Sequence, residues 1–98
     1  MTPQHLEALD RANEIRIARA HLKADIRAGE MTVPEALNDQ REMVATMKVA
    51  DLLKAQERWG DKRTNRLLRF LDISQNKLCG TLTDRQRDLI CLHFRGEF

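Results

Sequence analysis

Residues 60–94, GDKRTNRLLRFLDISQNKLCGTLTDRQRDLICLHF, decide the fold of this chain. The first part, residues 62–71, predicts a helix with a basic outer side and an inner side made of Leu67, Leu68, Phe70 and Leu71. Residues 72–82 are rich in residues that favour turns and caps, so we expect two consecutive turns there. Thr83 and Gln86 form a capping-box pattern, which predicts a last helix whose core residues are Leu89, Ile90, Leu92 and Phe94.

A further helix is predicted just before this stretch. It begins at residues 47–49, places Val49, Leu52 and Leu53 on one face, and ends in a tight turn at residues 59–61. Residues 49–94 therefore indicate a helix, a turn, a second helix, two turns and a third helix.

The N-terminal third predicts one long helix. Thr2 can cap it with Pro3 at its first position, and Gly29 stops it after about Ala28. Apolar residues recur there at steps of three and four and define one core-facing seam, made of Ala8, Ala12, Ile15, Ala18, Leu22 and Ile26. Thr32 and Glu35 form a second capping-box pattern, which predicts a short helix to about Asp39. Residues 40–46 are a connection or a brief helical turn.

Composition favours an all-α fold in one small domain. The 98 residues are 42% hydrophobic and 33% charged but only 4% aromatic, with four Gly and two Pro, which favours helix over strand. We expect a single domain over 1–98: a long helix or arm over 1–30, a short helix and connection over 31–46, and a compact module over 47–98. This length excludes a multi-step enzyme with its own cofactor domain.

Neither a membrane segment nor a reactive centre is predicted. No apolar run approaches the roughly 20 residues of a membrane span, and no signal core is present, so we expect a cytoplasmic protein. Cys79 and Cys91 lack metal-ligand spacing and are expected to be reduced packing residues. The three histidines, His5, His21 and His93, are widely separated. We therefore expect no enzyme activity, no metal, no cofactor and no small-molecule substrate.

Charge is uneven along the chain. The net charge is +2, with 17 basic against 15 acidic residues, and the surplus lies in residues 59–98. A polyanion would meet this third first. The long helix also carries a basic stripe within about 80° of its surface, formed by Arg16, Arg19, Lys23 and Arg27. The stripe is either a solvated helix face or an anion-binding one.

Several motifs carry a family resemblance. In the N-terminal helix the motif is Ala18-Arg19-Ala20-x-Leu22-Lys23, followed by Gly29. Further along the chain, four motifs align with the family without a gap between them: Met47-Lys48-Val49-x-x-Leu52-Leu53, Gly60, Leu71-Asp72-Ile73 and Asp84-Arg85-Gln86-Arg87. The chain resembles mycobacterial integration host factor and its actinobacterial relatives over nearly its whole length. The resemblance implies a helix-two-turns-helix fold after a long helix, and a nucleoid-associated protein that binds and bends double-stranded DNA through backbone and minor-groove contacts. A phage or mobile-element origin stays open.

The chain departs from the family pattern at cationic positions. Asp61 stands where the family has Lys, whereas Arg63 matches a family Lys. Lys77 falls on the first of a cluster of family arginines, and the next two arginine positions are Leu78 and Gly80. Either DNA binding is weakened, or it has shifted to Lys62, Arg63, Arg66 and the basic stripe of the long helix. An alternative is that the neutral replacements turned the scaffold toward a host nucleoid or replication protein.

The predicted DNA contacts fall into three groups. The turn entering a helix at residues 60–63 suits a phosphate, and the polar turn at residues 74–77 suits the second strand. No base-reading set is evident, so we expect low specificity. The candidate DNA-binding residues are Gly60, Lys62, Arg63, Arg66, Ser74, Gln75, Asn76, Lys77, Arg16, Arg19, Lys23 and Arg27. Trp59 is either a core anchor beside the turn or an apolar wedge at the DNA surface.

Overall fold

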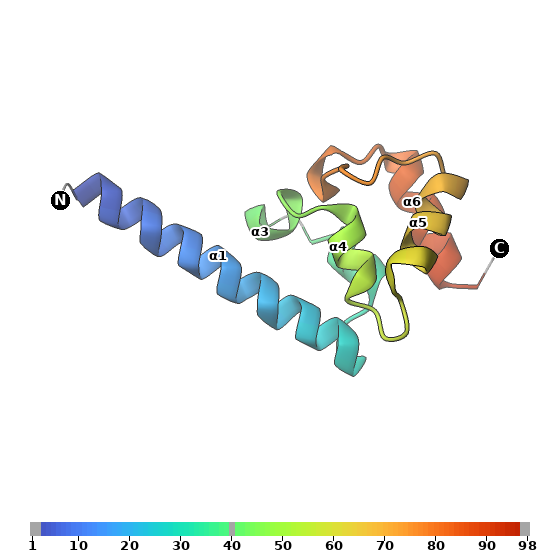
Figure 1. Ribbon diagram of the computed structural model, residues 1–98, viewed down its shortest axis with the longest axis horizontal. Coiled ribbons are helices and arrows are strands. Elements are labelled where there is room, and N and C mark those ends of the chain that lie inside the picture. The colour runs from blue at the N-terminus through green and yellow to red at the C-terminus, as the bar shows by residue number, and fades with distance from the viewer. Residues whose placement is uncertain (1–2, 40, 97–98) are drawn as a thin grey trace.

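The computed structural model describes residues 3–39 and 41–96, and the side chains of these from residue 9 onward. The described chain is all-helical, as predicted, and its one β-type pairing is an antiparallel bridge between Lys48 and Leu78. Figure 1 shows a long helix that extends away from a body built of the shorter ones. The elements are α1 (Pro3–Ala28), α2 (Val33–Leu37), α3 (Glu42–Ala45), α4 (Val49–Lys54), α5 (Asp61–Phe70), the 3-10 helix η1 (Cys79–Thr81) and α6 (Asp84–Phe94).

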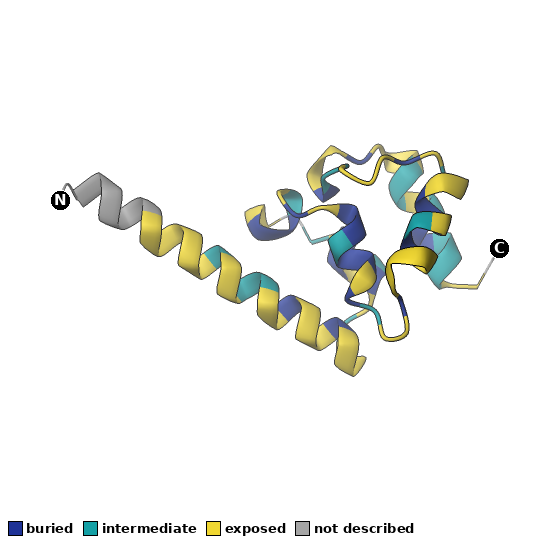
Figure 2. Cartoon of the chain, viewed as in Figure 1, coloured by how far each residue is buried: buried dark blue, intermediate teal, exposed yellow. Residues whose placement is uncertain are grey.

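Helix α1 joins the body through its C-terminal half. Leu22 and Ile26 are buried, and Ile15 and Ala18 pack partly against the same core. Ala12 is exposed, so the predicted seam begins later than expected because α1 runs past the edge of the body (Figure 2). The helix ends at Gly29, whose φ of +81° is the left-handed conformation that favours glycine. The predicted Thr2 cap and the Ala8 side chain lie outside what the structure describes.

Arg19 fastens α1 to α3. Its Nε donates to the carbonyl oxygen of Met43 at 2.8 Å, and its Nη2 donates to the hydroxyl of Thr46. Arg19 lies only about 20° from Ile26 around the helix at 100° per residue, so it sits at the border of the buried seam. One residue of the basic stripe predicted from the sequence, Arg19, therefore holds α1 against α3. An ion pair between the same helices joins Arg11 to Glu42.

Two backbone hydrogen bonds tie the turn segment to the start of α4. The N–H of Val49 donates to the carbonyl of Lys77 at 2.9 Å, and the N–H of Cys79 donates to the carbonyl of Met47 at 2.8 Å. They flank the bridge between Lys48 and Leu78. The predicted region of two turns is thus held against the start of α4 by backbone hydrogen bonds.

The predicted capping patterns are confirmed in one case and altered in the other. Thr83 and Gln86 make both bonds of a capping box at α6. At α2 the Glu35 N–H donates to the Thr32 hydroxyl, as expected, but that hydroxyl then donates to the Glu35 carboxylate, and the helix ends at Leu37. The second bond is therefore between side chains, and the Thr32 N–H is not the donor that the pattern predicted.

Phe70 corrects a second expectation. Leu67 and Leu68 are buried and Leu71 packs partly against the core, but the Phe70 side chain is 73% exposed. At 100° per residue, Phe70 points about 60° away from Leu67 toward the basic side of α5. Its apolar character alone suggested burial, and its position in the helix places it outside.

The cysteines are free and buried, as predicted. Burial raises the pKa of the Cys79 thiol to about 11, and burial likewise raises the pKa of Cys91. Among the described residues, no helix is long and apolar enough to cross a membrane. Within the same residues, no group of three or more His, Cys, Asp or Glu is placed to hold a metal ion.

Replacing Arg19 with Ala should lower the free energy of unfolding by about 1–3 kcal/mol, because the Met43 carbonyl and the Thr46 hydroxyl lose the donor that binds them. Arg16→Ala is the matched control, since Arg16 bonds only Asn13 on its own helix and should change stability by less than about 0.5 kcal/mol. Urea unfolding followed by circular dichroism measures both. Equal effects of the two substitutions would contradict the anchoring role.

The native thiols should react slowly with Ellman's reagent at pH 8, because both are buried and protonated. Urea should expose two fast-reacting thiols per chain. Folding raises the pKa of the Cys79 thiol, so this thiol makes the folded state less stable as the pH rises. Its contribution to the free energy of unfolding is complete below pH 9 and is lost between pH 9 and about pH 11. Native labelling at the rate of free cysteine would contradict this burial.

Candidate nucleic-acid interface

The outer side of α5 is a cationic face. Thr64, Leu67 and Leu68 turn inward and are buried. The residues that share the opposite side span about 120° at 100° per residue, and they are Lys62, Arg63, Arg66, Arg69 and Phe70, all exposed. We call these five residues the α5 face.

Acidic neighbours do not neutralise this face. Asp61, the one acid in α5, pairs with Lys54 of α4, whose Nζ lies 3.1 Å from the Asp61 Oδ1. Among the described residues, none of the four α5-face cations has an acidic oxygen within ion-pair distance. The Asp61 carboxylate is therefore paired within the protein, and the α5 cations remain available to an anion.

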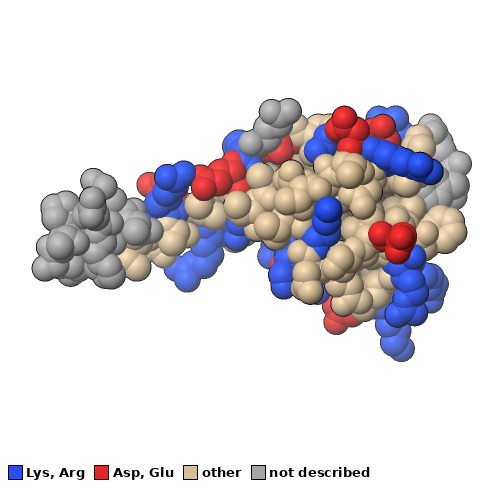
Figure 3. Space-filling view, turned by 90° about the horizontal axis from the view of Figure 1, so that it is seen from above, with Lys and Arg blue, Asp and Glu red and all other residues tan. Residues whose placement is uncertain are grey.

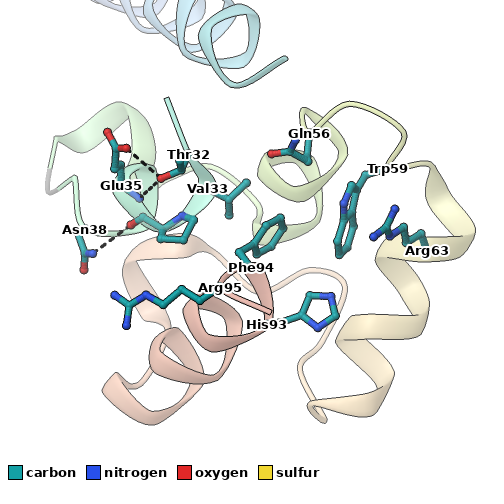
Figure 4. A pocket seen from close by; sticks show the side chains of 11 residues that line it. Thr32, Val33, Glu35, Asn38, Gln56, Trp59, Arg63, His93, Phe94 and Arg95 are labelled. Carbon is teal, nitrogen blue, oxygen red and sulfur yellow. Dashed lines mark hydrogen bonds between the residues drawn. The ribbon is translucent and has the colours of Figure 1, made fainter. Parts of the chain in front are cut away.

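Trp59 sets the orientation of α5 at its N-terminal end. Its side chain is 8% exposed, and its ring stacks on Phe94 of α6 at 5.0 Å between centroids and 23° between planes. The Arg63 guanidinium carbon lies 4.4 Å from the Trp59 ring centroid. Figure 4 shows Phe94 and Arg63 on opposite sides of the ring. The structure therefore favours the core-anchor interpretation of Trp59, and it gives Arg63 a fixed cation–π position.

Gly60 begins α5 without a side-chain cap. Its backbone is extended, with φ −98° and ψ −173°, and no side chain bonds the first-turn N–H groups. Such open N–H groups and the helix dipole favour an anion at this end. The turn predicted to suit a phosphate is therefore present, next to Lys62 and Arg63.

The polar turn at residues 74–77 meets α5 at one end. A shallow hollow is lined by Asn65 and Arg69 of α5 together with Ser74 and Gln75, and Asp72 also borders it. Ser74 orders the turn, because its hydroxyl accepts from the Asn76 N–H at 3.2 Å. Asn76 is exposed, whereas Lys77 is half-buried where the loop returns to α4. Ser74 and Gln75 therefore extend the α5 face.

The stripe on α1 forms a separate surface. Arg16, Lys23 and Arg27 are exposed, while Arg19 is held by α3. In Figure 1, α4 lies between α1 and α5, so the two basic surfaces do not merge. Figure 3 shows Lys and Arg side chains along the described part of α1 and further groups of them over the body.

Packing explains the neutral residues at positions 78 and 80, where the resemblance implies arginines. Leu78 is half-buried and belongs to the bridge with Lys48. A Cβ at Gly80 would lie 2.8 Å from the Ala45 Cβ and 3.0 Å from the Ala45 carbonyl oxygen. An arginine side chain at position 80 would therefore require the backbone of α3 to shift. The neutral residues at both positions have a structural reason in this chain.

Two members of the α5 face were absent from the predicted site residues. Arg69 belongs to the basic outer side predicted for residues 62–71 but not to the candidate DNA-binding residues, and the hollow beside Ser74 makes it the link between helix and turn. Phe70 was assigned to the core. The spacing of 100° per residue places both residues beside Arg66, so the signal was present in the sequence.

Comparison with known proteins identifies the family. No protein-family model matches the chain. The integration host factor of Mycolicibacterium smegmatis is 31% identical over 93 residues, which cover 93% of this chain and 89% of that protein. The integration host factor of Mycobacterium tuberculosis matches with the same values. The chain belongs to the mycobacterial integration host factor family.

A solved structure supports the fold of this integration host factor family member. The structure of sIHF bound to an 8-base-pair palindromic DNA matches with a TM-score of 0.83 and 22% identity. The match covers 87% of this chain and 98% of that one. The resemblance inferred from the motifs is confirmed.

Gly80→Ala should destabilise the protein by about 1–3 kcal/mol, because the added methyl group overlaps Ala45. Adding Ala45→Gly in the same chain should restore only part of the loss, because the close contact with the backbone carbonyl oxygen of residue 45 remains and glycine weakens α3. Gly60→Ser is a matched control, since a Cβ there meets nothing within 4 Å and the hydroxyl can cap α5. Urea unfolding of the three variants tests the contact; a Gly80→Ala variant as stable as the parent would contradict it.

Proposed function

We propose that this protein is a non-enzymatic, double-stranded DNA-binding and DNA-bending architectural protein of the nucleoid. The observation that carries the proposal is the α5 face, whose four cations have no acidic partner among the described residues. Family membership supports it, and so does the fold shared with sIHF, which is bound to DNA. No cofactor or small-molecule substrate enters the proposal.

The spacing of the cations suits a phosphate backbone. Lys62, Arg66 and Arg69 follow one another over about 10 Å of helix axis, at 1.5 Å per residue. That length spans about three phosphates of one strand at 3.4 Å per step. Cations on this side of the helix can therefore neutralise successive phosphates, while the open N–H groups at Gly60 receive another.

The adjoining turn suits the other strand of the same groove. Ser74 and Gln75 lie beside Arg69, and they can donate or accept short polar contacts at the minor groove. Asn76 and Lys77 continue the turn toward α4. Neutralising phosphates on one side of a duplex leaves repulsion on the other side, so bending toward the protein is favoured. Specificity then arises from DNA deformability more than from base-edge hydrogen bonds.

The α1 stripe is proposed as a secondary contact. Arg16, Lys23 and Arg27 are exposed on a helix that extends past the body, so they can meet phosphates only beyond the α5 site. Arg19 is removed from this set because its guanidinium binds α3. A host-protein partner stays a prediction from the sequence, and the packing of Leu78 and Gly80 removes the feature that suggested it.

Reversing three α5 cations to Glu, at Lys62, Arg66 and Arg69, should abolish saturable binding to a duplex of about 30 base pairs at 0.1 M salt. The parent should show a salt slope of about three or more, and each single reversal should lower that slope by about one unit. Fluorescence anisotropy at several salt concentrations measures both quantities.

The matched control reverses Arg16, Lys23 and Arg27 on α1, which changes the net charge by the same amount. This variant should keep saturable binding with a smaller loss of affinity, because the α5 face is intact. Circular dichroism verifies that both variants are helical. If the α1 variant loses DNA and the α5 variant retains it, the assignment of the primary site to α5 is wrong.

A further inference from the structure

Phe70 is an aromatic side chain placed where burial does not require it. The exposed large hydrophobic residues of the described chain are Leu9, Ile17 and Phe70, with 50%, 56% and 73% of the side chain exposed. Leu9 and Ile17 lie on α1, whereas Phe70 belongs to the α5 face. A ring with this exposure is open to a ligand that meets the α5 face.

The ring stands between two shallow hollows with basic rims. One is lined by Lys62, Asn65, Arg66 and Arg69 together with Phe70. The other is lined by Trp59, Arg63, Leu67 and His93, again with Arg66 and Phe70. Every cation of the α5 face therefore borders one hollow or the other, and Phe70 is the apolar element common to both.

This arrangement matches the two chemistries of DNA. Cations at helical spacing suit phosphates, which lie on the outside of the duplex, and a flat apolar ring suits the faces of bases, which lie inside it. A protein partner would match the ring but would need several acidic groups at phosphate spacing to match the cations. The combination favours DNA.

We propose that Phe70 is the wedge of this DNA-binding surface: its ring enters between two neighbouring base pairs while Lys62, Arg66 and Arg69 hold the phosphates beside that step. The inference rests on the proposed DNA-binding function and adds a residue and a mode of bending to it. Apolar wedges unstack a base step and kink the duplex, so the bend is localised at Phe70.

Insertion has a measurable consequence for the choice of DNA. Unstacking a step costs free energy, so a duplex whose stacking is already interrupted by a single-base bulge should bind more tightly than a fully paired one. This preference should depend on the ring at position 70. The phosphate contacts, and hence the salt slope, should not depend on it.

The experiment compares the parent protein, Phe70→Ala and Phe70→Trp on three DNAs that carry 2-aminopurine: a paired duplex of about 30 base pairs, the same duplex with a one-base bulge, and the single strand. The parent should raise 2-aminopurine fluorescence in the paired duplex and prefer the bulged one. Phe70→Ala should weaken duplex binding by about tenfold, lose the fluorescence rise and the preference, and keep the salt slope. Phe70→Trp should retain both signals.

Ile17→Ala is the matched control, because it removes another exposed apolar side chain away from α5. If Phe70→Ala behaves like Ile17→Ala while the parent binds with its salt slope, the wedge is refuted and the proposed function stands. If 2-aminopurine responds only in the single strand, Phe70 stacks on unpaired bases and the duplex wedge is likewise refuted. If the parent binds none of the three DNAs, the proposed function itself fails.

Discussion

The packing of Trp59 between Phe94 and Arg63 is the constraint on which the basic surface depends. Trp59 lies two residues before the first residue of α5, so fixing its ring against α6 fixes where α5 begins. Arg63 covers the other side of the ring, which sets the rotation of α5 about its own axis. With that rotation set, Leu67 and Leu68 face the core and the remaining cations face solvent. One buried aromatic residue thus links the core to the surface that we assign to DNA.

Charge placement in the rest of the chain keeps that surface basic. A net charge of +2 suggests a weak polyanion binder, but five described acids are paired with cations outside the α5 face: Asp39, Glu42, Asp51, Asp61 and Asp84. Asp61 is held by Lys54, Asp39 by Arg41 and Glu42 by Arg11. The hydrogen bonds from Arg41 hold the pKa of Asp39 below its ordinary value. Local distribution, more than total charge, decides what the surface can bind.

Local rules in the sequence predicted most of the fold, and long-range packing accounts for what they missed. Gly29 and the Thr83 box depend on neighbours in the chain, and both are present. The role of Arg19 depends on Met43 and the need for Gly80 depends on Ala45, partners that only the folded chain brings near. The exposure of Phe70 needs no distant partner to explain it, because the angular spacing of an α-helix already places this residue among the cations of residues 62–69. The prediction that Phe70 is buried rested on its hydrophobicity alone.

The most direct test of the α5 assignment is a nitrogen-15 NMR titration of the protein with a duplex of about 30 base pairs, following the backbone amides and the arginine Nε signals. We expect the largest changes at residues 60–70 and 74–77, with smaller ones at Arg16, Lys23 and Arg27. Arg19 should change little because its Nε already donates to Met43. Changes confined to α1, with α5 unaffected, would contradict the assignment of DNA binding to the α5 face.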